Sequence, residues 1–165
     1  MEYFDVVDKN RISLGYKKVR GEILKDSEFN VGVEMWIIND NSILMTRRSK
    51  NKSHPGMWEV PGGCCQSGES SVDTVNREML EEIGVTFKEE DYELIGTELY
   101  KKQFVDIYFS NKSINLKDIT LQDEEVESVK FVSENEFIKM KNNNEIVPSV
   151  LERYNIIKEK LHLNW

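Results

Sequence analysis

No stretch of the chain approaches the ~18 consecutive apolar residues that a membrane-spanning helix requires. Residues 1–5 also lack the positive charges of a signal peptide. Cationic side chains are in the minority, since 22 Lys and Arg residues stand against 30 Asp and Glu residues, for a formal net charge of −8. This balance argues against non-specific binding to nucleic acid polymers or anionic membranes. We therefore expect a cytoplasmic protein that binds neither.

Cysteine is scarce as well, because Cys64 and Cys65 are the only two and are adjacent. A normal disulfide between neighbours is geometrically unfavourable, and this usage suits a reducing compartment. Without a second Cys or His pair, the two thiols do not make a zinc site. They are reactive thiols, metal ligands of another kind or loop residues, and we favour loop residues.

The chain has no internal repeat, low-complexity tract or linker, and its 165 residues are 39% hydrophobic and 32% charged. These values predict a single soluble domain spanning residues 1–165. Alternating and β-branched segments predict strands at residues 3–8, 30–38, 42–48, 92–100, 103–110 and 126–132. Short helices are expected from a capping-box pattern at Ser133 and from Pro148. Strands mixed with about three helices favour a sheet covered by helices on both faces.

A helix over residues 71–83 is the most clearly marked element. Ser70 and Asp73 have the spacing of a capping box, and Gly84 suits the left-handed position that ends a helix. An apolar stripe at helical period should face the core and consists of Val72, Val75, Met79, Leu80 and Ile83. The other face of this helix is acidic.

That acidic face carries Glu78, Glu81 and Glu82 at positions i, i+3 and i+4, directly after a glycine-containing loop. Like charges at this spacing repel one another and destabilise the helix. A hard divalent cation would convert the repulsion into ligation, and Mg²⁺ usually binds between carboxylates and substrate phosphates. The segment therefore predicts a site for a metal ion and a diphosphate. The alternative is an acidic, solvent-facing helix, which leaves the glycines and the register unexplained.

The spacing resembles the signature of the Nudix hydrolases, G-x5-E-x7-R-E-U-x-E-E-x-G-U, where U is aliphatic. All nine defined positions are filled, by Gly63, Glu69, Arg77, Glu78, Met79, Glu81, Glu82, Gly84 and Val85. The resemblance implies an α/β/α sandwich with a mixed sheet. It also implies metal-dependent hydrolysis of a nucleoside diphosphate linked to another moiety.

By position, the resemblance implies that Glu78, Glu81 and Glu82 ligate Mg²⁺ or Mn²⁺ together with the backbone carbonyl of Gly63. Glu69 and Arg77 would pair and hold the loop against the helix. The general base is open between glutamates of the signature, Glu81 and Glu82, and glutamates before the last strand. Of the latter, Glu124 and Glu125 are the main candidates, and Glu127 and Glu98 are further ones.

Arg47 and Trp58 are the expected substrate-binding residues. Trp58 would stack on a base, although packing beneath the loop is the alternative. The substrate is a small diphosphate whose identity the sequence leaves open. Since Nudix proteins are often dimers, a homodimer is possible.

Residues 43–58 are also similar to isopentenyl-diphosphate isomerases, which share this fold. Those enzymes need a cysteine just after the Trp-led strand and a glutamate on a later strand. Here the cysteines are displaced to 64 and 65, and no glutamate stands in register within residues 103–106. Hydrolysis is therefore the favoured activity, with an isomerase-like enzyme or a non-catalytic nucleotide-binding module as alternatives.

Overall fold

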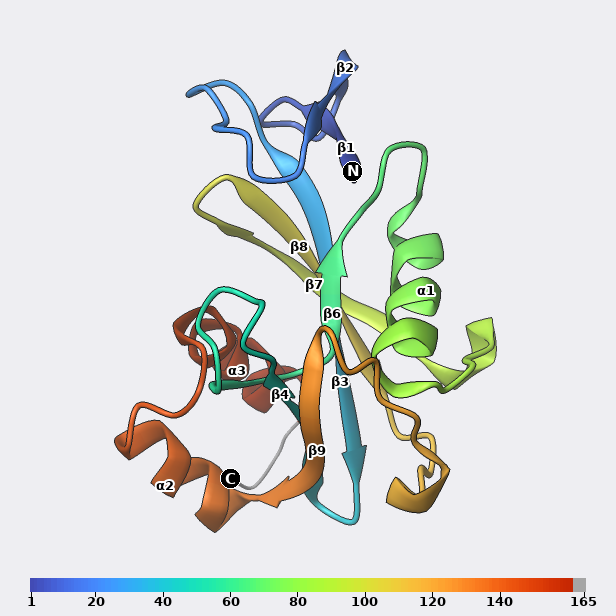
Figure 1. The fold of residues 1–165 in the computed structure, drawn as a ribbon, viewed down its shortest axis with the longest axis vertical. Helices are drawn as coiled ribbons and strands as arrows, with labels where there is room; N and C mark the ends of the chain where they lie inside the picture. The colour runs from blue at the N-terminus through green and yellow to red at the C-terminus, as the bar shows by residue number, and fades with distance from the viewer. Residues whose placement is uncertain (162–165) are drawn as a thin grey trace.

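A computed structural model of the chain describes residues 1–161 (Figure 1). A small antiparallel hairpin, β1 (Tyr3–Val7) and β2 (Ser13–Val19), precedes a seven-stranded sheet. The strands of that sheet are β3 (Asn30–Asn39), β4 (Ser42–Arg48), β5 (Trp58–Glu59), β6 (Gly62–Cys64), β7 (Glu93–Tyr100), β8 (Gln103–Ser110) and β9 (Val126–Ser133). The helices are α1 (Ser71–Ile83), α2 (Glu134–Asn142) and α3 (Pro148–Lys160), with 3₁₀ turns η1 (Glu89–Asp91) and η2 (Leu116–Asp118). Within residues 1–161, no helix is both long and apolar enough to cross a membrane.

The sheet is mixed, as predicted. Its strand order is β5-β4-β3-β8-β7, with β6 also paired to β3 and β9 to β4. Strands β3 and β8 run parallel, whereas β4 and β6 are antiparallel to β3. The β3–β4 hairpin closes through Asp40 and Asn41, whose φ angles of 46° and 58° are both positive. Two positive φ values are those of a type I′ turn, the two-residue connection that matches the twist of a hairpin.

The helices cover opposite faces of the sheet (Figure 1), and strand β3 shows why. Met35 and Ile37 pack in one cluster with Met79 of α1, while Trp36 packs in the other with Tyr154 of α3. Successive side chains of a strand point to opposite faces, so an apolar β3 supplies both cores. The predicted α/β/α arrangement is confirmed.

Helix α1 begins and ends where the sequence predicts. The hydroxyl of Ser70 accepts from the backbone N–H of Asp73, whose side chain accepts from the Ser70 N–H, and Gly84 adopts φ 69°. The predicted apolar stripe is partly wrong. Its buried members are Val75, Met79 and Ile83, whereas Val72 and Leu80 are exposed at 43% and 55%.

Other elements depart from the sequence-based expectations. Strands β2, β5 and β6 were not predicted, because β2 is largely exposed and because β5 and β6 are only two and three residues long. Ser133 precedes α2 as expected, but its side chain forms no capping hydrogen bond. Helix α3, in contrast, begins at Pro148 as expected, and it buries Val150, Tyr154 and Ile157.

Side-chain hydrogen bonds join the β1–β2 hairpin to the glycine loop and to strand β8. The Asp5 carboxylate accepts from the Ser67 hydroxyl at 2.7 Å and from the Gly68 N–H at 2.9 Å. From the hairpin turn, the Arg11 guanidinium donates to both oxygens of the buried Asp106 at 2.7 and 2.8 Å. A bidentate pair of this kind fixes orientation as well as distance. The hairpin is thereby held close to the loop that precedes α1.

Candidate active site

Gly63, on β6, lies against the first acidic residue of the α1 face. A Cβ atom at Gly63 would overlap the carboxylate of Glu78, whose residue is only 7% exposed. A Cβ at Gly62 would overlap the backbone carbonyl of Val33 on the paired strand. Strand pairing therefore requires glycine at position 62, whereas a side chain at position 63 would force the Glu78 carboxylate to move.

Arg77 joins the glycine loop to helix α1. Its guanidinium forms a bidentate pair with Glu69, with Nε–Oε1 at 2.7 Å and Nη2–Oε2 at 2.9 Å, and Nη2 also donates to the Cys64 carbonyl at 3.2 Å. The Arg77 hydrogen bonds hold the pKa of Glu69 below its usual range. The pairing of Glu69 with Arg77 is therefore present as predicted.

The third nitrogen of Arg77 contacts the acidic face itself. Nη1 lies 2.9 Å from a carboxylate oxygen of Glu78 and 2.9 Å from one of Glu81. Burial raises the pKa of Glu78, although Arg77 opposes this shift. The Glu81 side chain remains 45% exposed. Two of the three glutamates are therefore bridged by one cation.

Glu82, the third glutamate, is fully buried. It accepts from the Lys52 ammonium at 2.9 Å and from the Gly62 N–H at 3.1 Å. Burial raises the pKa of Glu82 to about 8 despite the opposing charge of Lys52. Lys52 was not predicted to be a site residue, because the sequence shows only a polar loop there.

Lys52 is surrounded by carboxylates. Besides Glu82, its ammonium lies 3.4 Å from Glu59 and 3.2 Å from Glu125. Burial alone would lower the pKa of Lys52, but Glu82 and Glu59 outweigh it and raise that pKa well above its usual value. Lys52 therefore stays charged and links α1 to β5 and to the segment before β9.

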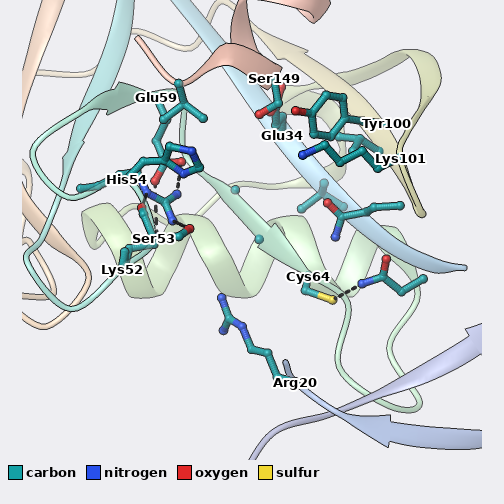
Figure 2. A pocket seen from close by; sticks show the side chains of 18 of the residues that line it. Arg20, Glu34, Lys52, Ser53, His54, Glu59, Cys64, Tyr100, Lys101 and Ser149 are labelled. Carbon is teal, nitrogen blue, oxygen red and sulfur yellow. Dashed lines mark hydrogen bonds and ion pairs between the residues drawn. The ribbon is translucent and has the colours of Figure 1, made fainter. Parts of the chain in front are cut away.

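The cavity beside this cluster has a volume of about 530 Å³. Its walls include Gly62, Gly63 and Arg48. Cys64, Lys52 and Glu59 also line it and are labelled in Figure 2. A neighbouring cavity of about 410 Å³ shares Arg20, Arg48 and Lys52 and is also lined by Glu124 and Glu125. Arg20 follows strand β2, so the N-terminal hairpin contributes a cation to both cavities. The two cavities thus share Arg20, Arg48 and Lys52 as cations, next to several carboxylates.

Arg47 and Trp58, the predicted substrate-binding residues, line neither of these cavities. Arg47 donates to the Gly56 carbonyl at 3.0 Å and pairs with Glu127 at 3.3 Å. The Trp58 ring packs under the Lys130 ammonium, 4.3 Å from the ring centroid. Because side chains alternate along β4, it is Arg48 that faces the cavity, where it pairs with Glu59.

The two cysteines are free thiols, and only Cys64 lines the cavity. Cys64 ends strand β6 and accepts from the Asn30 amide at 3.2 Å, so it is not the loop residue expected. Burial raises the pKa of Cys64 and raises that of Cys65 to about 11. A thiol that stays protonated at neutral pH is neither a good nucleophile nor a good metal ligand.

Within residues 1–161, no three His, Cys, Asp or Glu side chains already converge in the geometry of a metal-ligand set. The carboxylates of α1 instead contact Arg77 and Lys52. Their donor chemistry nevertheless suits a hard cation, since buried or half-buried carboxylate oxygens gather beside a backbone with no side chain at Gly63.

Comparison with known proteins agrees with this geometry. The NUDIX domain family matches residues 28–154. An uncharacterized Nudix hydrolase of Listeria monocytogenes is 31% identical over 156 residues, covering 90% of this chain and 89% of the relative.

Two solved structures share the fold. DR0079 from Deinococcus radiodurans matches with a TM-score of 0.74 at 18% identity, over 88% of this chain and 92% of that one. A bifunctional NMN adenylyltransferase/ADP-ribose pyrophosphatase from Francisella tularensis, solved with AMP and a manganese ion, matches with a TM-score of 0.65 at 20% identity. That match covers 79% of this chain and 41% of the other. Family match, relatives and fold agree: the chain belongs to the Nudix family and is a hydrolase that acts on phosphoanhydride bonds.

Proposed function

We propose that the chain is a Mg²⁺- or Mn²⁺-dependent pyrophosphohydrolase that cleaves a nucleoside diphosphate linked to another moiety. The observation that carries this proposal is the contact of Glu78 with the bare backbone of Gly63, next to the buried Glu82. Two buried carboxylates with perturbed pKa values near a cavity mark a candidate functional site. Residues 1–165 would form one domain, with the N-terminal hairpin as part of the site.

The metal would be held by Glu78, Glu81, Glu82 and the carbonyl of Gly63. When bound, a divalent cation neutralises diphosphate charge and lowers the pKa of its bound water. The protein's own contribution is positional. Arg77 holds the loop and helix together through Glu69, and the Gly62 N–H orients Glu82. The Francisella tularensis protein of the same fold, solved with a manganese ion, supports this cofactor class.

Arg20, Arg48 and Lys52 would bind the diphosphate, because they are the cations that line both cavities. Glu125 is the stronger of the two predicted outside bases. Its carboxylate reaches the ammonium of Lys52, which in turn contacts Glu82, whereas the Glu124 side chain is exposed. A carboxylate at this position can take a proton from water that attacks a phosphate bound between these groups.

An isopentenyl-diphosphate isomerase has less support. The carboxylate on β8 is Asp106, which is bound by Arg11 and Thr97 and does not line the cavity. Cys64 lies beside the glycine strand with a raised pKa. Asp106 is therefore not placed to transfer a proton to a substrate in the cavity, and Cys64, which lines the cavity, stays protonated at neutral pH.

A panel of nucleotides and nucleotide derivatives, assayed for Mg²⁺-dependent release of monophosphate, tests the proposal. We expect hydrolysis that EDTA abolishes and that added Mg²⁺ or Mn²⁺ restores. Turnover of isopentenyl diphosphate would instead support the isomerase. Binding of nucleotides without turnover would identify a binding module and contradict the proposal.

Metal binding should displace protons from the α1 face. Because the pKa of Glu82 is about 8 in the metal-free protein, a cation competes with a proton for this carboxylate near neutral pH. We expect Mn²⁺ binding to release protons at about pH 6.5 and almost none at about pH 9.5. The affinity for Mn²⁺ should rise from the lower pH to the higher one. Titration calorimetry in buffers of different ionisation enthalpy measures the release. Equal release at both pH values would contradict the expectation that Glu82 exchanges its proton for the metal.

Arg20 should contribute to substrate affinity. In Arg20→Ala, we expect KM to rise about tenfold, or ~1.4 kcal/mol, with kcat nearly unchanged, because a cation facing the diphosphate is lost. Steady-state kinetics on the best substrate of the panel provide the measurement. Glu2→Gln is the matched control, since it removes the Arg20 partner at the protein surface without touching the cavities. An unchanged KM in Arg20→Ala would remove this residue from the site.

A further inference from the structure

The main cavity has a second end, away from the glutamates of α1. Figure 2 shows Tyr100, Lys101 and Ser149 together on one side of the cavity and Lys52 and Ser53 on the other. The second end is built from Tyr100 at the end of β7, from Lys101 in the turn after it, from β3 and from helix α3. The proposed metal and diphosphate positions account for the first end and leave this one unexplained.

Arg153 of α3 is the central polar residue of the second end. It lines the cavity and is only 3% exposed. Its Nη2 pairs with the Glu34 carboxylate, and its guanidinium carbon lies 5.8 Å from the centroid of the Tyr100 ring. Among the described residues, neither Nε nor Nη1 has a hydrogen-bond partner. Unpaired buried donors are rare in folded proteins, so they point to a missing acceptor.

The electrostatics around Arg153 favour a neutral acceptor over an anion. Glu34 already compensates the charge of Arg153, and its other oxygen accepts from the Trp36 indole N–H at 3.3 Å. The carboxylate is thus fully engaged, and the unused capacity consists of the N–H donors of Arg153. A second anion would find little net positive charge at Arg153, whereas a carbonyl oxygen would satisfy a donor.

Tyr100 adds an aromatic surface to these donors. Its ring forms the cavity wall next to Arg153, with the exposed Lys101 ammonium 5.2 Å from its centroid. Aromatic rings and guanidinium planes are the surfaces on which bases stack. A cavity of about 530 Å³ is also large enough for a nucleoside beside a diphosphate.

We propose that this end of the cavity binds the nucleobase of the substrate, with the base against Tyr100 and a base carbonyl accepting from Arg153. The inference rests on the proposed function and extends it to a substrate class: nucleotides of guanine, cytosine or uracil. Adenine has no carbonyl oxygen and is expected to bind less tightly. Arg153 and Tyr100 act here in substrate recognition, and they take no part in bond cleavage.

Binding of hydrolysis products tests this without any turnover. We expect titration calorimetry to show GMP, CMP and UMP binding about tenfold or more tighter than ribose 5-phosphate, which lacks a base. Tyr100→Leu should reduce the affinities for GMP, CMP and UMP to within about threefold of the affinity for ribose 5-phosphate. Arg153→Lys keeps a positive charge opposite Glu34 but loses the planar set of guanidinium N–H donors. It should therefore abolish the preference for GMP, CMP and UMP over AMP. Leu99→Ala is the matched control, because Leu99 is exposed and does not line the cavity. This variant should bind each ligand with unchanged affinity.

Equal binding of all four monophosphates and ribose 5-phosphate by the unmodified protein would overturn the inference. So would a preference that survives unchanged in folded Tyr100→Leu and Arg153→Lys. Failure of the proposed function is a separate result, seen as absence of metal-dependent hydrolysis for every diphosphate regardless of its base. A protein that discriminates bases without hydrolysing them would support the base site and contradict the proposed reaction.

Discussion

Glu82→Gln should lower kcat by about 10³-fold or more, equivalent to ~4 kcal/mol of transition-state stabilisation. The amide keeps the size of the side chain and an oxygen that can accept from the Gly62 N–H, but it cannot ionise to the carboxylate that a cation would bind. Lys52 retains Glu59 and Glu125 as partners, so folding should be little affected. Thermal unfolding should show a Tm within about 5 °C of the unmodified protein. Steady-state kinetics at saturating Mg²⁺ measure the loss of turnover.

The matched control for this substitution is Glu93→Gln on β7, an exposed residue outside both cavities. It makes the same chemical change and should leave kcat as it is. A folded Glu82→Gln protein with normal kcat would show that this carboxylate has no role in the reaction. The general base and the metal would then both have to be sought elsewhere.

Gly63→Ala should also reduce activity severely, by about 10²-fold or more. A Cβ at this position would overlap the Glu78 carboxylate, so the side chain of Glu78 must move away from the strand. The substitution adds one methyl group and no charge, and it therefore isolates the geometry of the site from its electrostatics. The kcat value and the Mn²⁺ affinity should fall together, because the Glu78 carboxylate would hold the metal ion that hydrolysis requires.

Gly96→Ala is the control for the glycine substitution. A Cβ there would meet only a methyl group of Ile156, at 3.9 Å, which is an ordinary van der Waals contact. This variant should keep full activity and normal Mn²⁺ affinity. If Gly63→Ala did the same, the close approach of Glu78 to the strand would have no functional meaning.

The sequence predicts those features of the fold that local patterns encode. Helix α1 is placed correctly because Ser70 and Gly84 mark its two ends. Strand β2 was missed because its stability comes from pairing with β1 and its side chains are mostly exposed, so no apolar alternation marks it. Leu80 was wrongly assigned to the core because a helical period alone does not define how wide the buried stripe is.

In the candidate site, too, local patterns predict some features, whereas others depend on the fold. Gly63, Glu78 and Glu82 lie within one continuous segment, so their spacing alone indicates their proximity. Arg20 and Arg153 come from opposite ends of the described chain, and only the fold brings them to the same cavity. Arg47 was predicted to bind substrate, whereas Arg48 is the residue that lines the cavity. Segment-level reasoning does not separate the two, since one residue along a strand reverses the face.

The most direct test of the account is where a divalent ion binds. A crystal soaked in Mn²⁺ and measured at the manganese absorption edge would locate the ion by its anomalous signal. The account predicts a peak among the carboxylates of Glu78 and Glu82 and the carbonyl of Gly63, with the Lys52 ammonium displaced from Glu82. Mn²⁺-dependent hydrolysis by the same protein, with the anomalous peak elsewhere and these oxygens still bound to Arg77 and Lys52, would contradict it.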